Sequence, residues 1–130
     1  MNKTYGPYRA VVKVGHYYFV SGLVGIDPQT GEANSKLEVQ ARQALANLES
    51  ALNDQGLSKY DIVKTTIYLV DIEQFSIVNQ VYCEMFDDPY SRPARSTVEV
   101  SALPKLTKNK LLVEIEAIAH QPSIDLLQYD

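Results

Sequence analysis

The sequence predicts an α+β fold in which two helices cover one face of a β-sheet. Five segments are rich in β-branched and aromatic residues, most with alternating polarity, and two segments repeat apolar residues every three to four positions. Their order along the chain is β-β-α-β-α-β-β. The 130 residues suffice for one core and are too few for two, so we expect one domain spanning residues 1–130.

The chain should begin with a β-hairpin. Residues 10–14 and 17–20 have strand character, and Gly15-His16 between them suits a two-residue turn. Ser21-Gly22 is expected to end the second strand. The cluster Asp-Pro-Gln-Thr-Gly at residues 27–31 then predicts a turn.

The clearest helix follows the hairpin. Ser35 and Glu38 have the spacing of a capping box, and Gly56 stands where a glycine commonly ends a helix. One apolar stripe runs between these signals, so the helix should lie on the sheet. The stripe comprises Leu37, Ala41, Ala44, Leu45, Leu48, Ala51 and Leu52.

A strand and a second helix come next. Residues 61–70 alternate, with Val63, Thr65, Ile67 and Leu69 on one face. Asp71 with Gln74 should open the helix, and Asp87-Asp88-Pro89 should stop it. Its apolar stripe is Phe75, Val78, Tyr82, Met85 and Phe86.

The last two strands, residues 95–101 and 110–119, each separate their residues by face. We expect the aliphatic sets to lie under the helices, namely Ser96, Val98 and Val100 in the first strand and Leu111, Val113, Ile115, Ala117 and Ala119 in the second. The opposite face then mixes charged residues with Leu112 and Ile118. An uncovered face of this character predicts a homo-oligomer.

Composition excludes several classes of protein. Hydrophobic residues make up 45% and charged residues 22%, which excludes disordered and fibrous chains. The net charge of −4 argues against a nucleic-acid partner. No apolar run has the length of a membrane span and the start lacks a signal-peptide pattern, so we expect a cytoplasmic protein without a membrane partner.

The sequence offers few groups for metal or thiol chemistry. Two histidines and one cysteine do not make a metal site, so neither a metal nor a cofactor is expected. Cys83 lies one position from the stripe of the second helix, and we interpret it as a half-buried packing residue.

Arg95 and Glu116 are the candidate catalytic pair. Both fall on the expected non-core face, where the guanidinium could clamp a carboxylate and the carboxyl group could orient or deprotonate a water molecule. Spacing alone favours, over this catalytic role, a cross-strand ion pair or a solvated face formed by Glu114 and Glu116. Asn79, beside the stripe of the second helix, and Tyr8, after Gly6-Pro7, are by themselves ordinary boundary and loop residues.

Segments along nearly the whole chain resemble the RidA/YjgF family of reactive-intermediate deaminases, whose members are also called L-PSP endoribonucleases. The Pro93-Ala94-Arg95-Ser96 and Glu114-Ile115-Glu116-Ala117-Ile118-Ala119 segments are the most specific. The others are Gly6-Pro7-Tyr8, Tyr18-Phe19-Val20-Ser21-Gly22, residues 40–48, residues 61–69, residues 78–82, Thr97-Val98-Glu99-Val100 and Leu103-Pro104.

This resemblance implies a chorismate-mutase-like fold with a mixed sheet, assembled as a homotrimer with clefts between neighbouring subunits. It implies that Arg95 holds a substrate carboxylate and that Glu116 positions the attacking water. The cleft would be lined by Tyr8, Ser21, Gly22, Asn79 and Thr97. The implied substrates are 2-imino and enamine acids such as 2-aminoacrylate, 2-iminopropanoate and 2-iminobutanoate, which are hydrolysed to 2-oxo acids and ammonia.

Three positions depart from the common deaminase pattern: Arg9, Leu23 and Thr97. Arg9 and Leu23 should change the size and charge of the cleft mouth. The segment 121–130 adds apolar residues that could pack on a neighbour or close the cleft. Two alternatives remain beside the deaminase, namely a trimeric binder of small carboxylates or metabolites without turnover, and an RNA-cleaving enzyme.

Overall fold

The computed structural model describes residues 3–121, so the predicted packing of the segment beyond residue 121 lies outside the described residues. The order β-β-α-β-α-β-β is confirmed. Three short 3-10 helices lie at Lys59–Asp61, Ile72–Gln74 and Pro89–Ser91. The main elements are β1 (Val11–Val14), β2 (Tyr17–Val24), α1 (Leu37–Asp54), β3 (Ile62–Leu69), α2 (Phe75–Met85), β4 (Ala94–Glu99) and β5 (Val113–His120).

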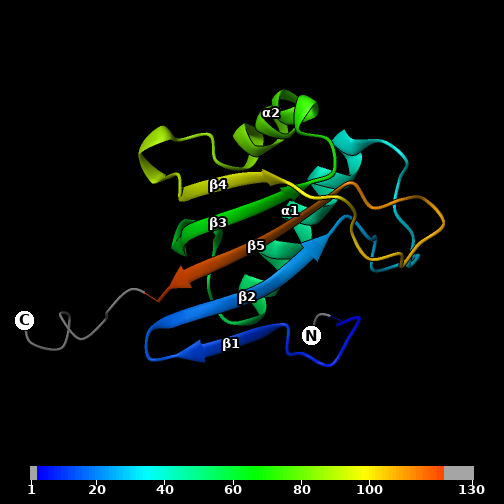
Figure 1. Ribbon diagram of the computed structural model, residues 1–130. Coiled ribbons are helices and arrows are strands. Elements are labelled where there is room, and N and C mark those ends of the chain that lie inside the picture. Colours follow the sequence, from blue (N-terminus) through cyan, green and yellow to red (C-terminus); the bar gives the residue numbers. More distant parts are fainter. Residues whose placement is uncertain (1–2, 122–130) are drawn as a thin grey trace, which may run out of the picture.

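The strands form one mixed sheet in the order β1-β2-β5-β3-β4. Only the pairing of β3 with β4 is parallel among these strands, and α2 makes the crossover that parallel neighbours require. Figure 1 shows both helices on the same side of the sheet, with the opposite side uncovered. The predicted α+β class is therefore confirmed. No helix within residues 3–121 combines the length and apolarity that crossing a bilayer requires.

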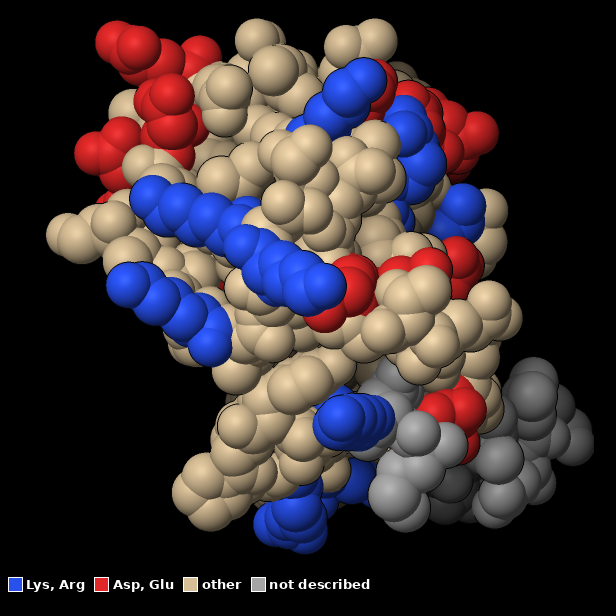
Figure 2. All heavy atoms as spheres, turned by 90° about the vertical axis from the view of Figure 1, so that its right-hand side faces the viewer, with Lys and Arg blue, Asp and Glu red and all other residues tan. Residues whose placement is uncertain are grey.

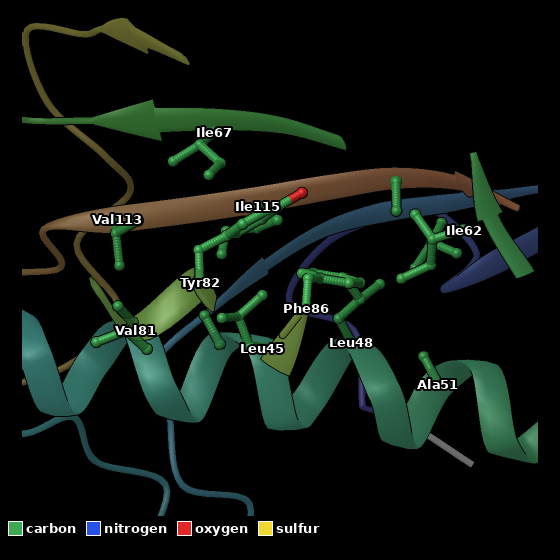
Figure 3. Close-up of a cluster of buried hydrophobic side chains, with 14 of the residues drawn as sticks. Leu45, Leu48, Ala51, Ile62, Ile67, Val81, Tyr82, Phe86, Val113 and Ile115 are labelled. Atoms are coloured by element: carbon green, nitrogen blue, oxygen red, sulfur yellow. The ribbon is translucent and has the colours of Figure 1, made fainter. Parts of the chain in front are cut away.

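The core lies between α1, α2 and the helix-facing side of the sheet. Leu45, Leu48 and Ala51 of α1 point toward the strands, where they meet side chains such as Ile115 (Figure 3). The predicted core face of β5 is confirmed, because Val113, Ile115, Ala117 and Ala119 are all buried.

The predicted facing of β4 is wrong. Residues paired in a sheet share a face, and β4 pairs Arg95 with the buried Thr65 and Thr97 with the buried Ile67. Arg95 and Thr97 therefore face the helices, whereas Val98 is 44% exposed on the uncovered side. Aliphatic character was a poor guide because β4 is an edge strand that α2 covers only in part.

Of three predicted element ends, two are wrong and one is confirmed. β2 continues through Ser21 and Gly22, which form a bulge instead of ending the strand. The capping box of Ser35 does not form: α1 starts after Lys36, whose N–H donates to Asn34 Oδ1. Gly56 ends α1 as predicted, with a φ of +77° that disfavours other residues.

Gln40 anchors α1 to the segments that flank β5 and precede the helix. Its Nε2 donates to the carbonyls of Asn34 at 2.7 Å and Lys110 at 2.9 Å, and its Oε1 accepts from the N–H of Leu112 at 2.9 Å. The side chain is fully buried, and these three hydrogen bonds replace those that its amide group would make to water. The same turn of α1 lies against Gly25, where a Cβ would come within 2.4 Å of the carbonyl oxygen of Gln40.

We expect Gln40→Leu to lower the free energy of unfolding by about 2 kcal/mol or more, because it leaves one N–H and two carbonyls without partners. Urea unfolding followed by circular dichroism measures the change. Gln80→Leu on the exposed side of α2 is the matched control and should change stability by less than about 0.5 kcal/mol. Equal effects of the two substitutions would contradict this role of Gln40.

Candidate functional site

Arg95 is held in one orientation by side chains of α2. Its Nη2 donates to Asn79 Oδ1 at 2.5 Å, and its Cζ lies 4.8 Å from the ring centre of Tyr82 and 5.2 Å from that of Phe75. The guanidinium is thus in contact with two aromatic faces, which attract a cation. Its four remaining N–H groups, together with its fixed plane, suit a ligand that accepts two parallel hydrogen bonds, such as a carboxylate.

The Tyr82 ring is itself held in place by a buried hydrogen bond. Its hydroxyl shares a 2.7 Å hydrogen bond with the buried Thr65 Oγ1. Burial raises the pKa of Tyr82, although this hydrogen bond and the nearby Arg95 act in the opposite direction. Tyr82 therefore remains a neutral aromatic surface for Arg95 at physiological pH.

Thr97 lies two residues after Arg95 on the same face of β4. Its Oγ1 is buried, and within residues 3–121 it stands out as the buried side-chain oxygen without a hydrogen-bond partner. Buried hydroxyls are normally paired. Arg95, Asn79 and Thr97 thus form one group, the arginine cluster, with an unused hydroxyl beside a cation.

Tyr8, Ser21 and Gly22 line a cavity of about 140 Å³ elsewhere on the chain. Glu114 of β5 also lines it. The bulge in β2 lies at Ser21 and Gly22, and the Ser21 hydroxyl donates to the backbone carbonyl of Arg9 at 2.7 Å. This hydrogen bond ties the N-terminal loop that carries Tyr8 to the bulge.

The absence of a side chain at Gly22 makes room for the Glu114 carboxylate. A Cβ at Gly22 would lie 2.4 Å from Glu114 Oε2, which is too close for a carbon and an oxygen that are not bonded. Burial, and secondarily the charge of Glu116, raise the pKa of Glu114. A half-buried carboxyl group with a raised pKa is a better proton acceptor than an ordinary one. We call Tyr8, Ser21, Gly22 and Glu114 the glutamate pocket.

Glu116 has a different environment. It lies opposite the bulge of β2 and accepts a short hydrogen bond from the hydroxyl of Tyr68, which raises the pKa of that tyrosine. Glu116 is the candidate that the sequence favours, but the acidic residue that lines the cavity with Tyr8, Ser21 and Gly22 is Glu114. Both lie on the same face of β5, so alternation alone could not distinguish them.

The expectation that Arg95 and Glu116 share a face is wrong for a single chain. Arg95 pairs with Thr65 and Glu116 with Thr66, and consecutive residues of a strand face opposite sides. The possible ion pair between them is likewise excluded. The glutamate pocket is also remote from the arginine cluster, because β2 and β4 are separated by three strand spacings, about 14 Å in total.

Leu23 and Arg9, two of the positions that depart from the common deaminase pattern, line different hollows of the surface. Leu23 lines the cavity beside Glu114, whereas Arg9 lines a neighbouring groove between the N-terminal loop and the end of α1. Cys83, expected to be half-buried, is exposed. It lies 3.8 Å from a guanidinium nitrogen of Arg92, one turn of α2 after Asn79.

One face of the molecule carries charged side chains of both signs (Figure 2). Figure 2 shows basic and acidic side chains interspersed with uncharged surface on one face. Residues 3–121 bring no three His, Cys, Asp or Glu side chains together as a metal ion would need. The chemistry offered by the described residues is thus a preoriented guanidinium, a raised-pKa carboxyl group and hydroxyls.

Comparisons with known proteins identify the family of this chain. The sequence model of the family described as Endoribonuclease L-PSP matches residues 2–121. A RutC family protein of Pyrococcus horikoshii is 43% identical over 120 residues, which cover 92% of this chain and 90% of that protein. The Escherichia coli protein named "Putative reactive intermediate deaminase TdcF" is 41% identical over 115 residues, covering 88% and 86%.

Two solved structures have the same fold. The structure of E. coli TdcF with bound serine superposes with a TM-score of 0.84 at 38% identity, covering 92% of this chain and 91% of that one. The E. coli YjgF gene product superposes with a TM-score of 0.83 at 39% identity, with the same coverage. The chain therefore belongs to the Endoribonuclease L-PSP family, the RidA/YjgF family that its sequence motifs resemble.

Proposed function

We propose that this protein is a homotrimeric deaminase that hydrolyses 2-imino acids to 2-oxo acids and ammonia in clefts between neighbouring subunits. The single observation that carries the proposal is the division of the site. Arg95 and Glu114 are each positioned for chemistry, yet they lie on opposite faces of the sheet and on strands that β3 separates. One small molecule can contact both only if they come from two subunits.

The surface of the chain favours such an assembly. The uncovered face of the sheet exposes Val14, Tyr17, Phe19 and Val98. In addition, β4, which carries Arg95 and Thr97, is an edge strand. Apolar faces and strand edges of this kind are normally covered in the assembled protein. A contact between the β4 side of one subunit and the β2 side of the next joins unlike surfaces, and three such contacts close a ring.

Arg95 would bind the carboxylate of the substrate. Because Asn79, Phe75 and Tyr82 already fix the guanidinium, little orientation is lost on binding. Thr97 Oγ1 could donate a further hydrogen bond to the same carboxylate. The bound serine of TdcF supports the choice of ligand, since serine carries the α-carboxylate that a 2-imino acid also has.

Glu114, in place of Glu116, would act on water. Its carboxylate accepts a proton as the water oxygen bonds to the carbon of the protonated imine, giving a neutral carbinolamine. Returning this proton to nitrogen makes ammonia the leaving group. The carboxylate then accepts the hydroxyl proton as the C–N bond breaks, which releases ammonia and forms the 2-oxo acid, and the proton passes to solvent. Holding water and imine together in this way is catalysis by positioning and general base.

A second function, binding of a small carboxylate without turnover, rests on the same arginine cluster. Ammonia release from a freshly generated imine separates the two functions. RNA cleavage, suggested by the family description, fits less well because basic side chains share the surface with acidic ones (Figure 2).

We expect Arg95→Lys to lower kcat/KM for 2-iminobutanoate by about 100-fold, because an ammonium cannot form the two parallel hydrogen bonds. The imine is generated in situ by an amino-acid oxidase, and hydrolysis is followed as suppression of semicarbazone formation. Arg42→Lys, on the exposed side of α1, is the matched control. Full activity of Arg95→Lys with a folded trimer would refute the clamp.

We expect Glu114→Gln to lower kcat by roughly 10²–10⁴-fold with little change in binding of 2-oxobutanoate, since only the proton acceptor is lost. Glu116→Gln should stay active, and its effect should appear in the pH profile. Activity needs ionised Glu114 and falls as the pH drops through its raised pKa. Removing the Glu116 charge lowers that pKa, so the fall should move to lower pH.

The opposite pattern, with loss of kcat in Glu116→Gln and near-normal activity in Glu114→Gln, would return the catalytic role to Glu116. Glu38→Gln on α1 is the control for removing one negative charge, and its pH profile should match that of the unmodified protein.

A further inference from the structure

The cavity beside Glu114 has a strongly apolar wall that carboxylate binding and water activation do not use. Leu23, Val24, Ile26, Pro104 and Leu106 contribute to it, from the end of β2 and from the loop between β4 and β5. A substrate held next to Glu114 would have this wall beside its carbon chain.

Part of the wall is rigid and part is adjustable. Val24 and Ile26 are buried in a small hydrophobic cluster with Ala33 and Leu111, and Leu103 packs against it. Leu106 is 39% exposed and belongs to the loop. Leu106 is therefore the apolar residue of the lining whose side chain can adjust to a substrate without disturbing the buried cluster.

We propose that this cavity binds the side chain of the substrate and that Leu106 determines specificity for 2-imino acids with aliphatic side chains of about four carbons. The inference rests on the proposed function. The cavity volume of about 140 Å³ is nearly five times the roughly 30 Å³ share of a water molecule in the liquid, so a methyl group would leave most of the cavity unfilled.

The charges of the lining favour an apolar substrate side chain over an acidic one. Lys3 is the one basic residue of the lining in the described part of the chain, and its Nζ lies 5.4 Å from the ring centre of Tyr5, which occupies the ammonium with a cation–π contact. Glu114 adds a negative charge that repels a second carboxylate. An aliphatic side chain is therefore the occupant that this cavity favours.

The test compares imines generated in situ from alanine, 2-aminobutyrate, leucine and glutamate. One methylene in an apolar pocket changes kcat/KM by about 10-fold or more, so the leucine-derived imine should exceed the alanine-derived imine by at least that factor. Leu106→Ser should reduce this ratio several-fold, and Leu106→Met should restore it. Val39→Ser, at an exposed apolar position on α1, is the control and should keep the ratio.

A ratio near one, a preference for the alanine- or glutamate-derived imine, or an unchanged ratio in Leu106→Ser would overturn this inference while leaving the deaminase intact. If no imine is hydrolysed, the proposed function fails and the inference is decided by calorimetry. Tighter binding of 4-methyl-2-oxopentanoate than of pyruvate, lost in Leu106→Ser, would support it, and equal binding would overturn it.

Discussion

The parallel pairing of β4 with β3 determines where the functional side chains lie. Because this register aligns Arg95 with the buried Thr65, the guanidinium faces the helices and contacts α2. The antiparallel pairing of β5 with β3 leaves both glutamates on the uncovered face. A single chain therefore keeps the arginine cluster and the glutamate pocket apart, and under the proposed function they are two halves of one site that meet only between subunits.

Each half is preorganised by ordinary packing. Two aromatic rings and an amide hold the guanidinium, and a bulge with a glycine makes room for the Glu114 carboxylate. Neither half depends on the other for its geometry. Assembly would then bring together groups that are already oriented, so the cost of ordering them is met by folding and not by substrate binding.

Sequence reasoning was most accurate where one physical signal dominates. The alternation of β5 and the stripe of α1 identify the core, because burial on one face leaves little choice of residue. The predicted face of Arg95 was wrong. In the edge strand β4, Arg95 lies under the aromatic side chains of α2, whereas Val98 is exposed on the other face. Sequence reasoning could not separate Glu114 from Glu116, because both have the same parity in β5. Their difference comes from the bulge opposite β5, which brings Gly22 against Glu114 and leaves Glu116 with Tyr68.

Mixed trimers test the shared site most directly. Arg95→Lys and Glu114→Gln subunits, each expected to be at least about 100-fold less active alone, are coexpressed in equal amounts. If each cleft takes Arg95 from one subunit and Glu114 from its neighbour, about a quarter of the clefts regain both residues and the mixture recovers about a quarter of the unmodified activity. Activity no higher than that of the separate variants, in trimers shown to contain both subunits, would contradict a site shared between neighbours.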